Sequence, residues 1–125
     1  MLDEIVAHAQ RDAPNECCGV LATRDGEVLG VHATENIAAS PMRFEVEGPV
    51  LIRLLDEIEG GGADLGAIYH SHTRSEAYPS QTDINFAANW PGVEWLIVGL
   101  KPEEPEVRSY LIDGGEVTEV PVEVT

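Results

Sequence analysis

Two histidines stand two residues apart near the middle of the chain, in the segment HSHTRSEAYPSQTD that spans residues 70–83. Residues i and i+2 of a β-strand project from the same face, so the imidazoles of His70 and His72 can converge on one metal ion. Asp83 falls one turn into a helix that should begin at Ser80, after a loop long enough to fold its carboxylate back towards the strand. Two imidazoles and one carboxylate leave the fourth position of a tetrahedral zinc ion open, which is typical of a catalytic site.

The same residues also allow a plainer interpretation. Ser80 and Asp83 fit the pattern of a capping box, in which two side chains satisfy backbone N–H groups at a helix start, and a His-x-His pair alone is common in strands. The joint occurrence favours the metal site, because two of the four histidines fall within three residues, just upstream of that helix. Ser80 can both cap the helix and take part in catalysis.

A zinc-dependent hydrolysis also needs a base, and Glu16 in the segment PNECCGVL is the best-placed acid. It stands where an apolar run begins, so partial burial would raise the pKa of its carboxyl group towards neutrality. Glu76 is a poorer candidate because it lies in a polar stretch in the middle of a loop. A solvated acid between a helix and a strand describes Glu16 equally well, and the neighbouring residues favour neither interpretation.

The other reactive side chains suggest less. Cys17 and Cys18 are adjacent, which is a poor geometry for a disulfide and favours a reducing compartment. Both begin an apolar strand, where an inert buried thiol is expected, and a hydrolase that uses Cys18 as its nucleophile is the alternative. The chain has no H-E-x-x-H, no H-x-E with P-C-x-x-C and no glycine-rich phosphate loop, which argues against zincins, zinc deaminases and nucleotide enzymes.

Hydrophobic periodicity and turn signals predict the elements that position these residues. The strand that carries the histidines should place Leu65, Ala67 and Tyr69 on one face, and Ile68, His70 and His72 on the other. The pattern predicts helices at 2–12, at 49–59 and from 80 to a stop at Pro91, and strands at 17–23, 28–33, 65–71, 95–100, 107–112 and 117–122. This order predicts an α/β or α+β fold, a mixed β-sheet flanked by helices, and leaves the strand order open.

Length and charge set the remaining limits. A chain of 125 residues is predicted to form a single domain, residues 1–125. Its formal net charge of −16, from 23 acidic and seven basic residues, argues against nucleic-acid and membrane-surface partners. The longest apolar run, 95–100, is too short to span a bilayer, and no basic leader precedes the first helix, so a cytoplasmic protein is expected. The acidity favours adaptation to concentrated salt, with a surface for a basic partner as the alternative.

Taken together, the segments NECCGVL and HSHTRSEAYPSQTD resemble the catalytic signature of the JAMM (also MPN+ or Mov34/PAD-1/JAB) metalloproteases. The resemblance extends through the segment at 108–115. It implies an MPN-type mixed sheet of cytidine-deaminase-like architecture. It also implies zinc (Zn²⁺) ligation by His70, His72 and Asp83, a general acid/base at Glu16, and Ser80 assisting the oxyanion.

Within the family, the sequence is most similar to bacterial peptidases that release cysteine from the C-terminal Gly-Gly of a sulfur-carrier protein. Thr73 stands where well-known isopeptidases have proline, and no insertion resembles the lobes with which deubiquitinases grip ubiquitin. The resemblance implies a peptidase or isopeptidase that acts after the C-terminal glycine of a ubiquitin-like or sulfur-carrier protein. Removal of modifiers from protein lysines and a non-catalytic MPN scaffold are the alternatives.

Overall fold

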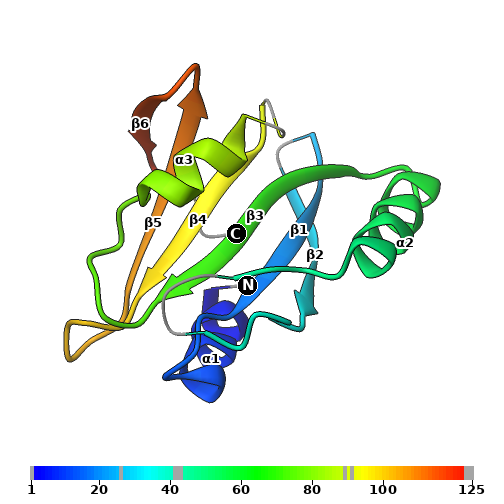
Figure 1. Ribbon diagram of the computed structural model, residues 1–125. Coiled ribbons are helices and arrows are strands. Elements are labelled where there is room, and N and C mark those ends of the chain that lie inside the picture. The colour runs from blue at the N-terminus through cyan, green and yellow to red at the C-terminus, as the bar shows by residue number, and fades with distance from the viewer. Residues whose placement is uncertain (1, 26, 41–43, 89, 91, 123–125) are drawn as a thin grey trace.

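The computed structural model describes residues 2–25, 27–40, 44–88, 90 and 92–122, which form one six-stranded mixed sheet with three helices (Figure 1). The helices are α1 (Leu2–Asp12), α2 (Gly48–Gly60) and α3 (Gln81–Ala87). The strands are β1 (Cys18–Arg24), β2 (Glu27–Thr34), β3 (Asp64–His72), β4 (Glu94–Gly99), β5 (Glu106–Asp113) and β6 (Glu116–Val120). The predicted mixed sheet flanked by helices is confirmed.

The strands lie in the order β2-β1-β3-β4-β5-β6. Only the central pair, β3 and β4, runs parallel among the paired strands described, and the other neighbours are antiparallel. Parallel neighbours require a crossover connection, which here consists of the 73–80 loop and α3. The crossover brings the start of α3 back over the sheet, and this is how Asp83 returns to the strand that carries the histidines.

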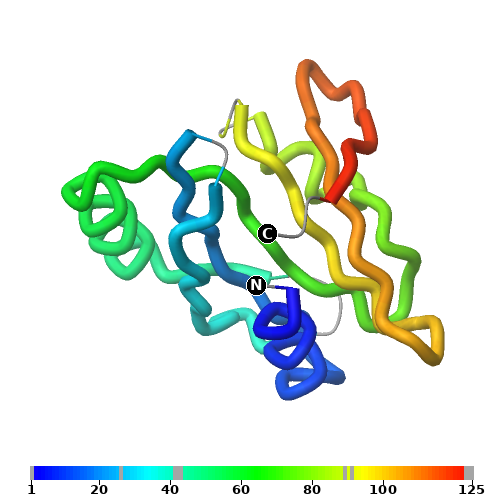
Figure 2. The backbone as a smooth tube through the Cα atoms, turned by 180° about the vertical axis from the view of Figure 1, so that it is seen from behind, coloured from blue at the N-terminus to red at the C-terminus, as the bar shows by residue number. Residues whose placement is uncertain are grey.

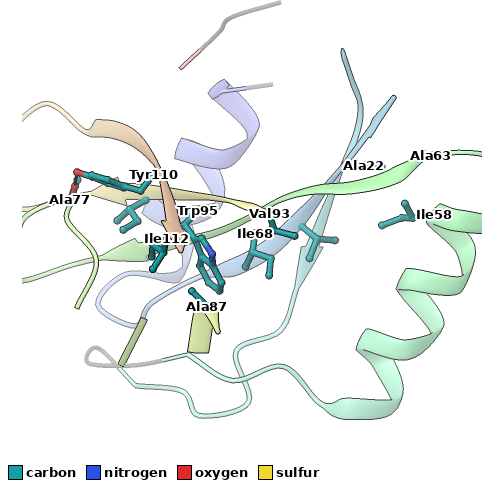
Figure 3. Close-up of a cluster of buried hydrophobic side chains, with 12 residues drawn as sticks. Ala22, Ile58, Ala63, Ile68, Ala77, Ala87, Val93, Trp95, Tyr110 and Ile112 are labelled. Carbon is teal, nitrogen blue, oxygen red and sulfur yellow. Dashed lines mark hydrogen bonds between the residues drawn. The ribbon is translucent and has the colours of Figure 1, made fainter. Parts of the chain in front are cut away.

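Each face of the sheet buries its own hydrophobic cluster. On one face α1 packs Ile5 and Ala9 against side chains of β1, β3 and β4, among them Tyr69. On the other face α3 crosses the sheet, and Ala87 joins a cluster that includes Ile68, Trp95 and Ile58 of α2 (Figure 3). Figure 2 shows the sheet from behind, with α1 towards the viewer and α3 on the far side.

The alternation predicted for the histidine strand is confirmed from Ala67 onwards but is wrong for Leu65, which packs against the α3 cluster because the register between β1 and β3 shifts between Ala67 and Leu65. Ala67 and Tyr69 belong to the α1 cluster and Ile68 to the α3 cluster. His70 lies edge-on to Trp95 with ring centroids 6.4 Å apart, so it faces the α3 side as well. The period-two pattern therefore directs both histidines to the face that α3 covers.

Several element ends differ from their predicted positions. The third helix ends at Ala87, because the chain tightens there into a turn in which the Trp90 N–H donates to the Ala87 carbonyl. The predicted stop at Pro91 lies outside the described residues. Strand β6 ends at Val120 rather than at 122, since Pro121 has no N–H to extend the ladder. Within the described part of the chain, no helix is both long enough and apolar enough to cross a membrane.

Candidate active site

The site lies where the parallel strands end. His72 is in register with Gly99, and the Leu100 N–H donates to the His72 carbonyl, so β3 and β4 terminate together. The antiparallel strand β1 begins beside them, with Cys18 opposite His70. Glu16 lies just before the start of β1, and the sheet register therefore brings it to the end of the histidine strand, although His70 is 54 positions away in the chain.

Three donor atoms meet at this point. His70 Nε2, His72 Nε2 and Asp83 Oδ2 are each 3.1 Å from the other two. Zinc binds nitrogen and oxygen at about 2.0–2.1 Å, so two ligands of a tetrahedral ion lie roughly 3.3 Å apart. The three atoms therefore have nearly the separations that one tetrahedral ion requires, and all three residues are buried.

The ring of His72 is oriented by the loop that follows β3. Its Nδ1 lies 2.8 Å from the Glu76 carbonyl oxygen, which can only accept, so Nδ1 carries a proton, and in the neutral ring the lone pair of Nε2 faces His70 and Asp83. A backbone acceptor behind a ring nitrogen is a common way to orient a metal-binding histidine. His70 is held differently: the Phe44 ring stacks on it with centroids 4.7 Å apart.

The carboxylate of Asp83 is oriented by the capping box predicted from the sequence. Ser80 N–H donates to Asp83 Oδ2 at 2.9 Å, and Asp83 N–H donates to Ser80 Oγ at 3.2 Å. Burial by itself would raise the pKa of Asp83, but the charge of His70, hydrogen bonds from both histidines and the Ser80 N–H outweigh it and hold that pKa well below its usual range. Asp83 Oδ2 belongs both to the capping box and to the group of three converging atoms. The helix-cap and metal-ligand interpretations of Asp83 are therefore compatible.

With both imidazoles neutral, the state in which they can bind a metal, the cluster holds more lone pairs than protons. In that state His72 Nε2 presents a lone pair, Asp83 Oδ2 is anionic and already accepts from Ser80, and His70 Nε2 can donate at most one proton to the two of them. A cation between the three atoms satisfies all of them at once. The residues therefore fit a metal ion, and nitrogen and carboxylate donors suit zinc.

Glu16 completes the site from the side of β1. Its side chain is 5% exposed, and Glu16, His70 and His72 offer donor atoms that all lie within 4.8 Å of one another. The structure shows no hydrogen bond from the Glu16 carboxylate to either histidine in the described chain, so Asp83 is the better third ligand. Burial raises the pKa of Glu16 to about 7; His72 lowers it and Asp83 raises it further. Such a carboxylate can exchange protons near neutral pH.

The backbone of Glu16 is clamped by a loop that sequence reasoning missed. Its N–H donates to the Ser40 carbonyl at 2.8 Å, and its carbonyl accepts from Asn36 Nδ2 at 2.9 Å. Asn36 Oδ1 in turn accepts from the backbone N–H groups of Ala38 and Glu45, at 3.0 and 2.9 Å. Nothing in the local sequence distinguishes Asn36 from a solvated asparagine, because two of these three partners, Glu16 and Glu45, lie 20 and nine positions away in the chain.

Ser80 lies at the open side of the cluster. It is exposed, and together with His72 it lines a depression of about 430 Å³. Its Oγ accepts from Asp83, and the structure shows no acceptor for its O–H among the described residues. The hydroxyl group can therefore donate to a molecule bound in the depression.

The cysteines are not arranged for nucleophilic catalysis. Both are buried and neither forms a disulfide. Burial is the main cause that raises the pKa of Cys17 to about 12 and that of Cys18 to about 11, so both thiols are protonated at neutral pH. Cys18 Sγ lies 3.2 Å from the Thr34 hydroxyl, and the structure shows no hydrogen bond from this thiol to a histidine among the described residues. The geometry gives no support to the thiol alternative.

Comparison with known proteins identifies the family. Residues 1–113 match the sequence profile described as prokaryotic homologs of the JAB domain. The chain belongs to the JAB-domain family. The resemblance drawn from the Glu16 segment and the 70–83 segment is thus confirmed over most of the chain.

Two curated relatives illustrate the branch. The CysO-cysteine peptidase of Mycobacterium tuberculosis is 37% identical over a 127-residue alignment that covers 99% of this chain and 86% of the relative. The desampylase of Haloferax volcanii is 38% identical over 102 residues, which cover 76% of this chain and 73% of the relative. Most of each relative is therefore represented in this JAB-domain chain.

Solved structures agree with the fold. The solution structure of a Desulfitobacterium hafniense protein superposes with a TM-score of 0.81 at 31% identity, over 95% of this chain and 84% of that one. The crystal structure of a JAB1/MPN domain protein from Archaeoglobus fulgidus superposes with a TM-score of 0.64 at 21% identity, over 98% and 91% of the two chains. At that lower identity the likeness concerns the fold alone.

Proposed function

We propose that the protein is a zinc-dependent peptidase that hydrolyses the bond after the C-terminal glycine of a ubiquitin-like or sulfur-carrier protein. The observation that carries the proposal is the convergence of His70, His72 and Asp83 on one point, with the buried carboxylate of Glu16 beside it. Membership of the JAB-domain family and the named activities of the relatives support the same reaction class.

In this proposal His70, His72 and Asp83 hold the zinc ion. Zinc held there would supply Lewis-acid chemistry, polarising a carbonyl oxygen and lowering the pKa of water to about 7. The protein contributes the orientation of the ligands: Glu76 fixes the His72 ring through its carbonyl oxygen, and Ser80 fixes the Asp83 carboxylate through its N–H. The ligands are thus positioned before the metal binds.

Two further side chains serve the hydrolysis itself, in which water adds across the scissile C–N bond. Glu16 accepts a proton from the attacking water and returns it to the leaving nitrogen, a role that suits a buried carboxylate with a pKa of about 7. Ser80 donates its hydroxyl proton to the oxygen that develops negative charge on the glycine carbonyl. The oxygen of water goes to the glycine carbonyl carbon and a proton goes to the amine.

For the substrate, we favour release of cysteine from a carrier that ends in Gly-Gly, by analogy with the CysO-cysteine peptidase. The desampylase relative supports a second candidate, removal of a ubiquitin-like modifier from protein lysines. A non-catalytic scaffold is a weaker alternative, because a scaffold needs neither the converging donor atoms nor the buried acid beside them.

The test is mass spectrometry of two substrates incubated with zinc-loaded protein: a Gly-Gly carrier bearing a C-terminal cysteine, and the same carrier linked to a peptide lysine. We expect loss of cysteine from the first, abolished by a chelator and restored by zinc. Activity that survives chelation but not thiol alkylation would overturn the zinc mechanism. Hydrolysis of neither substrate would overturn the peptidase assignment.

A further inference from the structure

The two segments that leave the parallel strands form the rim of the depression at the candidate active site. They lie side by side in both views of the backbone, after β3 and after β4 (Figures 1 and 2). His72 and Ser80 line this depression together with Arg74, Glu76 and Lys101. The carboxyl ends of adjacent parallel strands meet at one edge of a sheet, so side chains that follow them reach one site.

The side chains that line the depression carry two cations and one carboxylate, whereas the molecule as a whole is strongly acidic; Glu103 and Glu104, which follow Lys101, are not among the lining residues. The chain carries a net charge of −16 and a single lysine, and that lysine, Lys101, lies at the rim with Arg74. The structure shows no ion pair for either cation among the described residues, and Glu76 is the only carboxylate among the residues that line the depression. Three other arginines are engaged elsewhere, by Asp12, by the carbonyls of the 61–62 turn and by Glu106 and Glu119.

We infer that Arg74 and Lys101 form a binding site for the free α-carboxylate of the amino acid that leaves the carrier. The inference rests on the proposed function. A guanidinium group and an ammonium group are the side chains best suited to a carboxylate, and each charge-assisted hydrogen bond is stronger than a neutral one. The substrate carboxylate would thus be the ion-pair partner that the described residues do not provide for Arg74 and Lys101.

The position of the carboxylate in such a substrate agrees with this site. In a carrier–cysteine conjugate the carboxyl carbon is two bonds from the scissile nitrogen, so it lies within roughly 4 Å of the carbon that is attacked. A group that binds it must therefore stand at the immediate rim of the hydrolytic centre, where Arg74 and Lys101 stand with Ser80 and His72.

The same site distinguishes the two substrate candidates. In a conjugate to a protein lysine the scissile nitrogen is the side-chain amine, and the α-carboxyl group of that lysine is an uncharged peptide. Such a substrate offers the two cations no anion near the reacting bond. Arg74 and Lys101 therefore select amino-acid leaving groups over protein leaving groups.

The experiment compares a carrier that ends in Gly-Gly-Cys with the same carrier that ends in cysteine α-amide, both at one fixed ionic strength. Wild-type enzyme is expected to cleave the acid with a kcat/KM about tenfold higher than the amide. The double variant Arg74→Gln/Lys101→Gln is expected to lose about tenfold on the acid and little on the amide. Glu76→Gln removes a competing carboxylate and should shift the preference further towards the acid.

The matched control is Arg53→Gln, which removes a positive charge from the exposed side of α2, far from the rim. It should leave both rates unchanged, so a general effect of net charge is distinguished from a local one. The carboxylate site is overturned if the wild type cleaves the acid and the amide with equal kcat/KM, or if the double variant loses kcat/KM equally on both substrates. Either result leaves the proposed function standing. Cleavage of neither substrate overturns both.

Discussion

Two buried histidine clusters lie on opposite faces of β3, and they differ in how completely the ring nitrogens are satisfied. On the α1 face, His8 Nδ1 lies 2.7 Å from the Tyr69 hydroxyl and Nε2 lies 3.1 Å from Asp12 Oδ2. On the α3 face, three acceptor-type atoms crowd together, and Nδ1 of His70 has no hydrogen-bond partner among the described residues. The first cluster is complete as it stands, whereas in the second a cation would satisfy the three facing atoms and leave Nδ1 of His70 without a partner among the described residues.

The comparison shows that residue types alone do not identify a metal site. Both clusters combine buried histidine with aspartate, and His8 with Asp12 has the i, i+4 spacing that places two ligands on one helical face. The α1 cluster instead serves packing: Gly19 lies so close to Tyr69 that a Cβ there would stand 2.3 Å from the ring. Convergence of three possible ligand atoms, rather than composition, is the reason for proposing the α3 cluster as the metal site.

The largest effect is expected when the aspartate is removed from each of the two histidine clusters. Asp83→Ala should lower zinc affinity by more than about 100-fold and abolish hydrolysis, because it deletes one of three ligands and leaves the lone pairs of two histidines opposed. Asp12→Ala should keep one zinc per chain, since its partner His8 lies on the other face. Metal content after dialysis and titration with a competing chelator measure both. Equal loss of zinc in the two variants would mean that the distinction is wrong.

A smaller effect is expected from the acid beside the ligands. Glu16→Gln should retain zinc and lower kcat by about 10²–10⁴-fold, the usual contribution of a general base, while Glu27→Gln, at an exposed position of strand β2, should be neutral. Single-turnover kinetics on the carrier–cysteine substrate provide the rate. Wild-type turnover in the glutamine variant would place the base elsewhere.

The hydrogen bonds of Asn36 that hold the Glu16 backbone should contribute to the free energy of unfolding. Asn36→Ala deletes one hydrogen bond to Glu16 and two that close the loop at Ala38 and Glu45, so unfolding should become easier by roughly 2–4 kcal/mol. Asn85→Ala, on the exposed face of α3, removes a surface hydrogen bond to Gln81 and should change stability by only a few tenths of a kcal/mol. Urea unfolding compares the two, and similar values would show that Asn36 is not a clamp.

Local patterns predicted a large part of this structure. Alternation along β3 was enough to direct His70 and His72 to one face, and the Ser80–Asp83 spacing was enough to predict the helix start. These signals act over a few residues, where backbone geometry dictates side-chain direction.

What could not be predicted depends on contacts distant in the chain. The burial of Glu16 follows from the pairing of β1 with β3, and the interpretation as a solvated acid stayed open until that pairing was known. Asn36 and Phe44 belong to a segment without periodicity, and they acquire a role only because that segment folds over the site. Arg74 and Lys101, for which the described residues show no ion pair, likewise line one depression only because β3 and β4 end together.

The smallest effect concerns the stability of the metal-free protein as a function of pH. The pKa of Glu16 is about 7 in the folded protein, chiefly through burial, against an ordinary value of 4.5. Below pH 4.5 the carboxyl group is protonated in both states and contributes nothing. Between pH 4.5 and 7 the carboxyl group ionises only on unfolding, so the free energy of unfolding falls as pH rises. Above pH 7 the carboxylate is ionised in both states, and this loss of stability stays constant.

Glu16→Gln removes that loss of stability. The metal-free variant should therefore melt at the same temperature as the metal-free wild type near pH 4 and at a higher temperature at pH 8, whereas Glu27→Gln should show no such crossover. Calorimetric melting temperatures across this range at constant high salt test the prediction, because salt limits the repulsion among the 23 acidic residues and isolates the buried group. A variant that loses stability at pH 8 would show that the Glu16 carboxylate is solvated in the folded protein.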